Sequence, residues 1–307
     1  MSKPRRQLRR ALHGVLLLDK PKGVTSHQAL LSVRSLYNAD KAGHTGTLDP
    51  LATGLLPICF GHATKLTAHL LDARKRYLAQ VRLGEATTTG DSEGELIAHS
   101  NPSGLTLEVL KIAALACTGT MQQVPPMYSA IRRDGARLYE LAREGIEVER
   151  EPREVEIHAF GVVAFDGVTA TLDVTCSKGT YIRTLAEDWA RQFGQVAHLS
   201  GLHRLEVGVF GALEPVSMVT MATLETASDL ASLDRHLLST RAVVADWPQV
   251  VLTAEQAAKM DFGFSIPFEG APGWVAMSLE SGGFLGLGEQ LPDGRLQPRR
   301  WFGPAGV

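Results

Sequence analysis

The spacing of apolar residues changes several times along the first half of the chain. A continuous apolar run at 14–18 predicts a buried strand, and alternating apolar and polar residues at 76–83 predict a strand with one buried face. Ser26 could cap a helix, and three apolar positions share one face of that helix: Leu30, Val33 and Leu36. Further elements are expected as an apolar run at 55–60 and as helices at 63–72 and 107–116.

The second half of the chain begins with strand patterns and continues with an amphipathic helix. Residues 155–165 and 169–176 are expected to form strands. A Ser177-Lys178-Gly179 turn leads into a helix whose apolar stripe consists of Ile182, Leu185, Ala186, Trp189 and Phe193. Arg183 lies off that stripe, near the helix start. A strand-like piece at 205–215 and weak helices up to residue 245 complete this part.

Two segments lack periodicity and are rich in turn-forming residues. The first, residues 38–54, contains three glycines and one proline: Gly43, Gly46, Gly54 and Pro50. The second, residues 84–106, is rich in Thr, Gly, Asp and Ser. The first therefore predicts a loop shaped by glycine and proline, and the second an extended surface loop. A strand at 128–132, an Asp134-Gly135 turn and a helix at 138–143 are expected after them.

The C-terminal part of the chain changes character. Turns that contain Gly and Pro separate short strand patterns at 250–252, 274–279 and 284–289. A turn at 292–294 precedes a basic stretch with Arg295, Arg299 and Arg300. These patterns predict a small, mostly β appendage. We therefore expect a basic tail at 1–12, a large domain at 13–245 and a small domain at 248–307.

Composition narrows the class of protein. The 307 residues are 44% hydrophobic and 21% charged, which is the balance of an ordinary globular protein. The three cysteines, Cys59, Cys117 and Cys176, lie far apart without a Cys-x-x-Cys pair, so they predict neither a zinc ribbon nor a disulfide framework. No apolar run approaches the length of a membrane span. We expect a cytoplasmic protein with reduced thiols.

The formal net charge of -2 conceals an asymmetry along the chain. Residues 1–80 carry 13 Lys and Arg against 4 Asp and Glu, and the remainder carries 18 against 29. A basic N-terminal part beside an acidic remainder suggests a polyanionic partner on one face. Chance clustering and a solvated tail would give the same counts, the tail containing Arg5, Arg6, Arg9 and Arg10. Charge alone leaves both interpretations open.

Asp49 stands out in the glycine-rich segment because Pro50 follows it. Proline disfavours the helical conformation of the residue before it, and the neighbouring glycines permit tight bends, so the loop would present one carboxylate from a stiff backbone. A fixed carboxylate suits nucleophilic or general-base catalysis. An aspartate that only organises its own turn has the same local pattern. The residue chemistry by itself does not decide between the two.

Four segments, in order along the chain, resemble the motifs of one enzyme family. Residues 43–57 (GHTGTLDPLATGLLP) look like the signature motif of the TruB family of pseudouridine synthases, in which the aspartate is the nucleophile. Residues 18–23 (LDKPKG) match the family's Lys-Pro motif. Residues 75–77 (KRY) match its tyrosine motif, and residues 177–184 (SKGTYIRT) its arginine motif. The chain therefore resembles this family over most of residues 15–205.

The resemblance implies a role for each matched residue. Asp49 would attack the uridine, Tyr77 would pack against the target base, and Arg183 would pair with the Asp49 carboxylate and keep it ionised. Further substrate-binding residues are implied, with Tyr181 and Leu202 lining the uracil pocket, His44 contacting the RNA, and Lys20 with Pro21 supporting the catalytic loop. Attack at the ribose C1′, attack at the uracil C6 and abstraction of a sugar proton by Tyr77 all remain open.

The resemblance also implies a fold and an activity. The fold would be mixed α/β with a largely antiparallel sheet, followed by a small, mostly β, PUA-like RNA-binding domain. The activity would be isomerisation of uridine 55 to pseudouridine in the tRNA T loop after base flipping. No cofactor and no metal are expected, because the reaction has no net redox change and no group donor. The expected partner is the tRNA T stem-loop, with no membrane, no obligatory protein partner and a monomeric state.

Several residues keep simpler interpretations. Tyr77 could be an ordinary aromatic on the apolar face of its strand. Arg183 could pair with Glu187 one helical turn later, and Lys178 beside a helix start could bind an RNA phosphate. His198 and His203 suggest a metal pair, but no third ligand appears at a suitable spacing, so we do not expect a metal site.

Three other hypotheses about the function stay open. The short N-terminus without a lysine-rich tail favours a stand-alone bacterial tRNA enzyme, and guide-RNA-dependent ribosomal homologues are the near alternative. The chain could also be a tRNA-binding folding chaperone without essential catalysis. The third hypothesis is an aspartate-dependent hydrolase, but no second carboxylate that could serve as a general acid is evident in the sequence.

Overall fold

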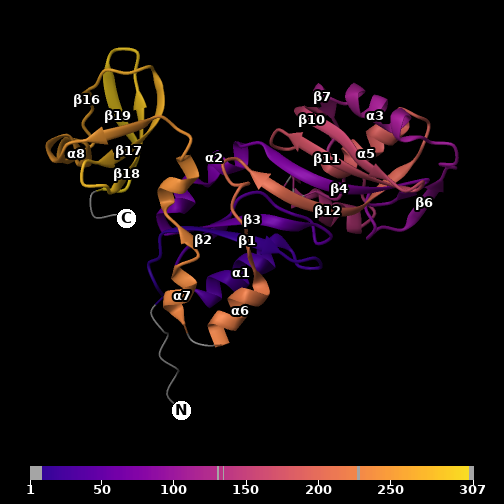
Figure 1. Cartoon of the computed structure of the whole chain (residues 1–307), viewed down its shortest axis with the longest axis horizontal. Helices are drawn as coiled ribbons and strands as arrows, with labels where there is room; N and C mark the ends of the chain where they lie inside the picture. Colours follow the sequence, from indigo (N-terminus) through magenta and orange to yellow (C-terminus); the bar gives the residue numbers. More distant parts are fainter. Residues whose placement is uncertain (1–8, 130, 134, 227–228, 304–307) are drawn as a thin grey trace.

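A mixed sheet crosses the larger part of the molecule, and a second, smaller sheet forms the C-terminal part (Figure 1). The computed structural model describes residues 9–129, 131–133, 135–226 and 229–303. Within these ranges the large sheet has ten strands and the small sheet five. In the same ranges, no helix combines the length and the apolar character that a membrane crossing requires. The ten-stranded sheet with its helices and the separate five-stranded sheet confirm the predicted mixed α/β class with a mostly β C-terminal domain.

The large sheet is largely antiparallel. Its main path runs β13-β1-β3-β12-β4-β11-β10-β7, with β14 beside β1 and β2 beside β3. The pairings of β1 with β13 and of β3 with β12 are parallel. Its strands are β1 (Gly14–Lys20), β2 (Ala42–His44), β3 (Thr53–Phe60), β4 (Lys75–Leu83), β7 (Gly119–Gln123), β10 (Arg153–Phe165), β11 (Thr169–Cys176), β12 (Ala197–Val207), β13 (Val216–Ser217) and β14 (Leu237–Leu238).

The junction of β3 with β12 joins the two halves of the large sheet. Only a short parallel register links them, His203 to Thr53 and Arg204 to Gly54. Gly54 has φ 95°, and a Cβ built there would lie 2.4 Å from the carbonyl oxygen of Arg204. A residue without a Cβ is therefore required where the two strands approach each other.

Helices cover the sheet and fix its loops. The helices of this part are α1 (Ser26–Leu36), η1 (Gly61–Leu66), α2 (Thr67–Asp72), α3 (Leu107–Ala116), α5 (Ile182–Arg191), α6 (Met218–Thr226), α7 (Leu230–Asp234) and η2 (Thr240–Val244). The expectation that Ser26 caps α1 is wrong. Thr25 is the N-cap and forms a capping box with Gln28, because its hydroxyl reaches the Gln28 N–H while Ser26 already has helical geometry.

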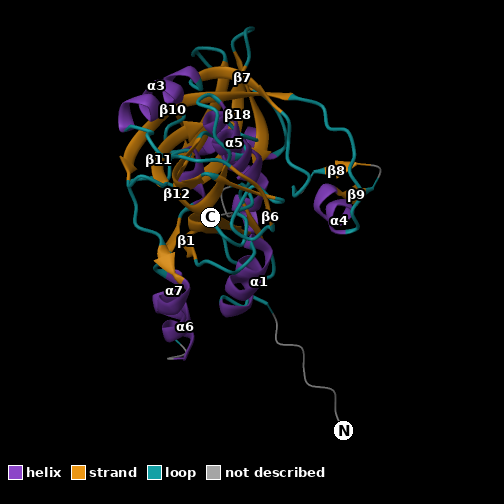
Figure 2. Cartoon of the chain, turned by 90° about the vertical axis from the view of Figure 1, so that its right-hand side faces the viewer, coloured by secondary structure: helices purple, strands orange, loops and turns teal. Residues whose placement is uncertain are grey.

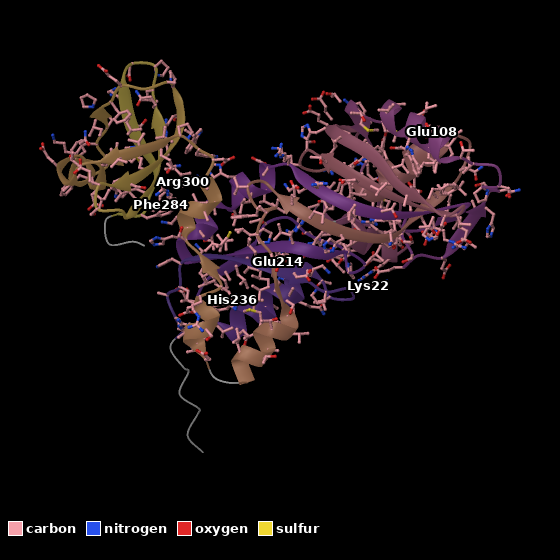
Figure 3. All side chains as sticks on the ribbon, in the orientation of Figure 1. Lys22, Glu108, Glu214, His236, Phe284 and Arg300 are labelled. Atoms are coloured by element: carbon pink, nitrogen blue, oxygen red, sulfur yellow. The ribbon has the colours of Figure 1, made fainter. Side chains whose placement is uncertain are left out.

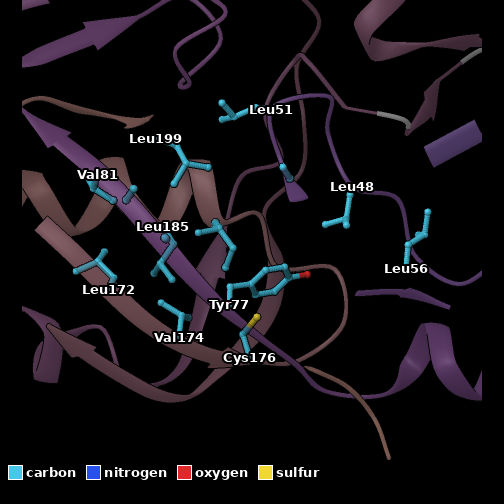
Figure 4. Packing of buried hydrophobic residues seen from close by; sticks show 14 of the residues in the cluster. Leu48, Leu51, Leu56, Tyr77, Val81, Leu172, Val174, Cys176, Leu185 and Leu199 are labelled. Carbon is cyan, nitrogen blue, oxygen red and sulfur yellow. The ribbon is translucent and has the colours of Figure 1, made fainter. Parts of the chain in front are cut away.

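The predicted alternation on β4 is confirmed by burial. Tyr77, Ala79, Val81 and Leu83 are all buried on one face. Figure 4 shows Tyr77 in this core with Val174 and Cys176 of β11 beside it and Leu48 and Leu56 on its other side. Trp189 of α5 is fully buried in the same cluster, and its Nε1 donates to the Leu110 carbonyl of α3 at 3.2 Å.

Four predicted segments differ from the structure. The strand expected at 128–132 is wrong, because residues 127–129 form a bend and, among the described residues of this stretch, strand structure covers only residues 132–133. The loop expected at 38–54 contains β2, and the one expected at 84–106 contains a hairpin of β5 (Glu85–Thr87) and β6 (Leu96–His99). The strand expected at 205–215 is wrong in its bounds, since β12 occupies 197–207 and residue 208 begins a turn. Two register shifts in the β12–β4 ladder interrupt the alternation that would have revealed the strand.

The C-terminal domain is a five-stranded sheet in the order β15-β17-β18-β19-β16 with one helix against it. Its elements are β15 (Gln249–Leu252), α8 (Ala254–Asp261), β16 (Ile266–Pro267), β17 (Gly273–Leu279), β18 (Phe284–Gln290) and β19 (Arg295–Trp301). The three predicted strands are confirmed. Neither α8 nor β19 was predicted from the sequence.

A small arm stands beside the main body (Figure 2). It consists of β8 (Arg132–Arg133), β9 (Ala136–Arg137) and α4 (Leu138–Arg143), and we call these residues the arm. The predicted helix at 138–143 is confirmed. Residue 134 of the predicted turn lies outside the described residues, as do Arg5 and Arg6 of the basic tail. Arg10 of that tail is described and forms an ion pair with Asp234 of α7.

Candidate active site

The loop that carries Asp49 is held by hydrogen bonds from three directions. We call residues 45–52, between β2 and β3, the Asp49 loop. Ser26 at the start of α1 accepts a hydrogen bond from the Leu48 N–H at 2.7 Å and donates one to the Leu48 carbonyl at 3.0 Å. Arg204 of β12 donates to the Gly46 carbonyl at 3.2 Å, and the Gly23 N–H donates to the Pro50 carbonyl at 2.8 Å. These hydrogen bonds therefore fix the backbone of the Asp49 loop.

Lys20 supports the same region from beneath. Its side chain is fully buried, and its ammonium donates to the carbonyls of Pro21 at 2.9 Å and Val24 at 2.6 Å. Burial lowers the pKa of Lys20 to about 8, while the nearby Asp49 carboxylate opposes that decrease. Lys20 is not part of the wall of the cavity that lies beside Asp49 and Tyr77. Its direct contact with a substrate stays a prediction that this burial does not favour.

Asp49 and Arg183 meet across the site. Arg183 Nη2 lies 3.0 Å from Asp49 Oδ2, and the Arg183 side chain is only 5% exposed. Arg183 also donates to the carbonyls of Thr89 at 2.9 Å and Tyr128 at 2.7 Å, and its Nη1 lies 3.6 Å from Asp91 Oδ2. These partners fix the guanidinium, so its Nη2 end is directed at the Asp49 carboxylate.

Two opposing effects act on the Asp49 carboxyl. Burial raises the pKa of Asp49, and the adjacent Arg183 guanidinium counteracts part of that rise. The Asp91 carboxylate adds a smaller rise to the pKa of Asp49. The protonation of Asp49 therefore depends on Arg183 remaining in place.

A cavity of about 290 Å³ opens beside Asp49. Its wall includes Asp49, Leu71, Lys75, Tyr77, Tyr181, Arg183, Leu202 and Arg204. Three residues expected at the base thus share one cavity with Asp49 and with its expected partner Arg183: Tyr77, Tyr181 and Leu202. They come from β4, the α5 start and β12, which lie far apart in sequence.

Tyr77 and Arg204 form the floor of this cavity. Tyr77 is 9% exposed and Arg204 is 1% exposed. Burial raises the pKa of Tyr77, and its interaction with Arg204 opposes that rise, so the phenol is protonated at neutral pH. Arg204 also donates to the Leu55 carbonyl at 2.7 Å. A buried cation thus connects Tyr77 to β3 and to the Asp49 loop.

Tyr181 occupies the N-cap of α5, where side chains from two strands hold it. Gln123 of β7 accepts from the Tyr181 N–H at 2.8 Å and donates to the Tyr181 carbonyl at 3.1 Å. Arg153 lies over the Tyr181 ring, with its Cζ 4.7 Å from the ring centre. The Tyr181 ring therefore has a fixed orientation at the cavity.

His44 lines a second, larger cavity of about 740 Å³ that adjoins the first at Asp49. The two cavities share Asp49 and Arg183 in their walls. Arg132, Arg137 and Arg143 of the arm line the larger one. Burial lowers the pKa of His44, with Arg204 adding to the effect, so the imidazole is neutral at pH 7. The larger cavity therefore adjoins the smaller one and carries arginines of the arm in its wall.

The two histidines considered as a metal pair, His198 and His203, have separate polar partners. His198 Nδ1 lies 3.0 Å from the Glu85 carbonyl, and His203 Nδ1 lies 2.8 Å from the Thr53 hydroxyl. In the part of the chain that the structure describes, no group of three His, Cys, Asp or Glu side chains could hold a metal ion.

Three contributors to the site were missed from the sequence: Arg204, Asp91 and Gln123. Arg204 lies in the same short segment as Leu202, but only the fold brings it to Tyr77 and Gly46. Asp91 lies in the segment interpreted as a surface loop and is 3% exposed. Glu187 pairs with Arg191 at 3.7 Å, so the simpler interpretation of Arg183 as its partner is wrong.

Comparison with known proteins adds an independent finding. A model described as TruB family pseudouridylate synthase (N terminal domain) matches residues 34–182, and one described as Pseudouridine synthase II TruB, C-terminal, matches residues 248–302. A protein of Nitrosococcus oceani named tRNA pseudouridine synthase B is 46% identical and covers 98% of both chains. Its namesake in Methylobacillus flagellatus is 47% identical over 98% of this chain and 99% of its own.

Solved structures share the fold. A chain in a crystal structure of a Cbf5-Nop10-Gar1 complex aligns with a TM-score of 0.70 at 24% identity, over 91% of this chain and 78% of that one. A chain in the archaeal box H/ACA sRNP Nop10-Cbf5 complex aligns with a TM-score of 0.68 at 21% identity, over 92% and 80%. At such identities the similarity concerns architecture alone.

Proposed function

The chain belongs to the TruB family of pseudouridine synthases, and on that basis we propose that it converts uridine 55 of the tRNA T loop with Asp49 as its nucleophile. Its relatives named tRNA pseudouridine synthase B are 43% to 47% identical. The protein is therefore an isomerase that turns uridine into pseudouridine in tRNA. The observation that carries the proposed mechanism is the Asp49–Arg183 pair, 3.0 Å apart, at the wall of a cavity floored by Tyr77.

The reaction explains why one oriented carboxylate suffices. The N1–C1′ bond of the nucleoside breaks, the uracil rotates, and a C5–C1′ bond forms. The C5 proton leaves and N1 gains a proton, so redox state and composition do not change. Attack by Asp49 at C1′ or at C6 would form one covalent bond, which must break again before the product leaves so that the carboxylate is regenerated. Arg183 would keep the carboxylate ionised and aimed, and the chemistry itself asks for no cofactor.

The cavity supplies what a flipped base requires. Extruding a base from a structured loop costs a few kcal/mol, which stacking and hydrogen bonds to the base must offset. We propose that Tyr77 and Leu202 pack on the uracil and that Tyr181 closes the pocket. His44 would contact the RNA at the gap left by the base, and Lys20 would act through the Asp49 loop.

We also propose how the whole chain is organised. It would comprise a basic tail at 1–12, a catalytic domain at 13–245 and an RNA-binding PUA-like domain at 248–307. The protein would act as a cytoplasmic monomer without an obligatory protein partner. Light scattering on the purified protein tests the monomer, and a stable dimer would contradict it.

The test compares wild type with Asp49→Asn on an unmodified tRNA transcript. Pseudouridine is mapped by carbodiimide modification and primer extension. We expect a single new stop at uridine 55 with wild type and none with the variant. A stop at another position would contradict the T-loop assignment. Tight tRNA binding by wild type without any stop would favour a folding chaperone instead.

A further inference from the structure

Helix α2 lies between the active-site cavity and the C-terminal domain. Leu71, near its end, lines the cavity with its side chain 44% exposed. The buried Lys75 ammonium donates to the carbonyls of Leu71 at 2.5 Å and Ala73 at 2.6 Å. Lys178, in the turn before α5, pairs with Asp72 at 2.9 Å. The end of α2 is thus built into the wall of the cavity.

The opposite side of α2 faces the C-terminal domain. His69 precedes Leu71 by two positions, and residues two apart point to different sides of a helix. The His69 ring lies edge-on to Trp247 at 4.7 Å and to Trp274 at 5.8 Å between ring centres. Trp274 belongs to β17, and Trp247 to the segment that precedes β15. These contacts have the geometry that aromatic pairs prefer.

A shared apolar core strengthens this joint. Leu70 is 2% exposed and belongs to a cluster that also contains Ala276, Phe284 and Leu287 of the C-terminal domain. Phe284 lies on the side of that domain that faces the larger part (Figure 3). His62 of η1 stacks on Phe302 with 4.9 Å between ring centres. Domains joined by a packed apolar interface do not move freely against each other.

We propose that the C-terminal domain holds the wall of the active-site pocket in place through α2, with His69 as a positioning residue for the isomerisation. This inference rests on the proposed function. The C-terminal domain acts on the rate of the chemical step as well as on RNA affinity, because the contacts of His69 and Leu70 fix the helix that carries Leu71. Misplacement of a reacting group by about 1 Å can cost about 100-fold in rate.

The test measures single-turnover conversion of two RNAs, a full tRNA transcript and an isolated T-arm stem-loop. We expect His69→Ala and Trp274→Ala to slow the conversion of both RNAs by about 10- to 100-fold at saturating enzyme. Burial lowers the pKa of His69, so the ring is neutral at pH 7 and phenylalanine can replace it. His69→Phe should keep the wild-type rate, whereas His69→Gln should be as slow as His69→Ala.

Phe262→Ala is the matched control, because this side chain is in the same domain but 81% exposed. It should leave both rates unchanged. The inference is overturned if the His69 and Trp274 variants weaken only the binding of full tRNA, or if His69→Gln is as fast as His69→Phe. If wild type converts neither RNA, the proposed function fails, which is a different result from fast conversion by the His69 variants.

Discussion

Gly54 shows how a single missing Cβ places the Asp49 loop. The carbonyl oxygen and the amide nitrogen of Arg204 would lie 2.4 and 2.9 Å from a Cβ at this position. Because Gly54 also has φ 95°, an L side chain would be strained there as well as crowded. The close approach lets Arg204 reach both the Leu55 and the Gly46 carbonyls.

Gly54→Ala is therefore expected to lower the free energy of unfolding by about 1–3 kcal/mol or more, because strain and a backbone clash act together. Urea denaturation measures this change. Gly43→Ala is the control, since Gly43 has no atom near the position of a Cβ. Equal stability of the two variants would show that β3 and β12 can move apart at no cost.

Arg183 should set the acidic limit of activity. The carboxylate of Asp49 must be ionised to react, burial raises the pKa of Asp49, and Arg183 opposes that rise. Arg183→Gln removes the opposing charge, so the acidic limb of the kcat/KM profile should move to higher pH by about 1–3 units. Activity would then be lost as pH falls through the higher value. Arg191→Gln, on the exposed side of α5, should leave the limb in place, and an unmoved limb in Arg183→Gln would refute the role of Arg183.

The sequence identified part of this site and missed part of it. Asp49, Tyr77 and Arg183 were foreseeable through motif resemblance, because each stands in a contiguous motif. Arg204 and Asp91 were not, because their roles depend on partners more than ninety residues away, as in the 158 residues between Arg204 and Gly46. Residue chemistry alone left Asp49 ambiguous, since nothing local reveals a partner guanidinium.

At the level of elements, α1 holds the Asp49 loop in place through hydrogen bonds. Its first residue, Ser26, bonds both the N–H and the carbonyl of Leu48, directly beside Asp49. Thr25 caps the helix, which leaves the Ser26 hydroxyl available for the loop. The helix and the Asp49 loop are thus fixed together by one buried side chain.

Ser26→Ala should remove both bonds and leave two backbone groups unsatisfied. The expected cost is about 1–3 kcal/mol in stability, with a fall in kcat rather than a rise in KM. Thermal unfolding and steady-state kinetics measure the two effects. Ser32→Ala, an exposed position on the same helix, is the control. A normal kcat in Ser26→Ala would show that the loop holds its shape without α1.

Elements with unbroken periodicity were predicted well, and the others were not. The helix expected at 107–116 and the strand expected at 169–176 match α3 and β11 in their bounds. The hairpin of β5 and β6 was missed because Asp91 builds its connection with local hydrogen bonds from Thr89 and the Glu93 N–H. Helix α8 buries only Ala257 and Met260, so its apolar signal is weak, although its Thr253–Gln256 capping box was visible.

At the scale of the whole molecule, arginine side chains gather around the larger cavity. The arm places Arg132, Arg137 and Arg143 around the larger cavity, beside Asp49. The N-terminal charge asymmetry is partly used inside the fold, since Lys20 and Lys75 are buried and Arg10 pairs with Asp234. The arginines around the larger cavity thus include three that the sequence count placed in the acidic remainder.

Arg132→Ala and Arg143→Ala should weaken tRNA binding in a salt-dependent way. Each lost phosphate contact reduces the slope of log K against log salt by about 0.7–0.9. Filter binding over a salt series measures that slope. Arg82→Ala, whose guanidinium pairs with Glu85 and lines neither cavity, should leave it unchanged. An unchanged slope in the arm variants would mean that the arm does not touch the RNA backbone.

The parallel pairing of β3 with β12 also determines when the pocket can exist. His203 lies beside Thr53 although 150 residues separate them, and closing so long a loop has an entropic cost that only the finished contacts offset. A ribosome makes Asp49 long before it makes Arg204. A nascent chain released before residue 204 therefore carries the whole signature motif and still has no floor for a base.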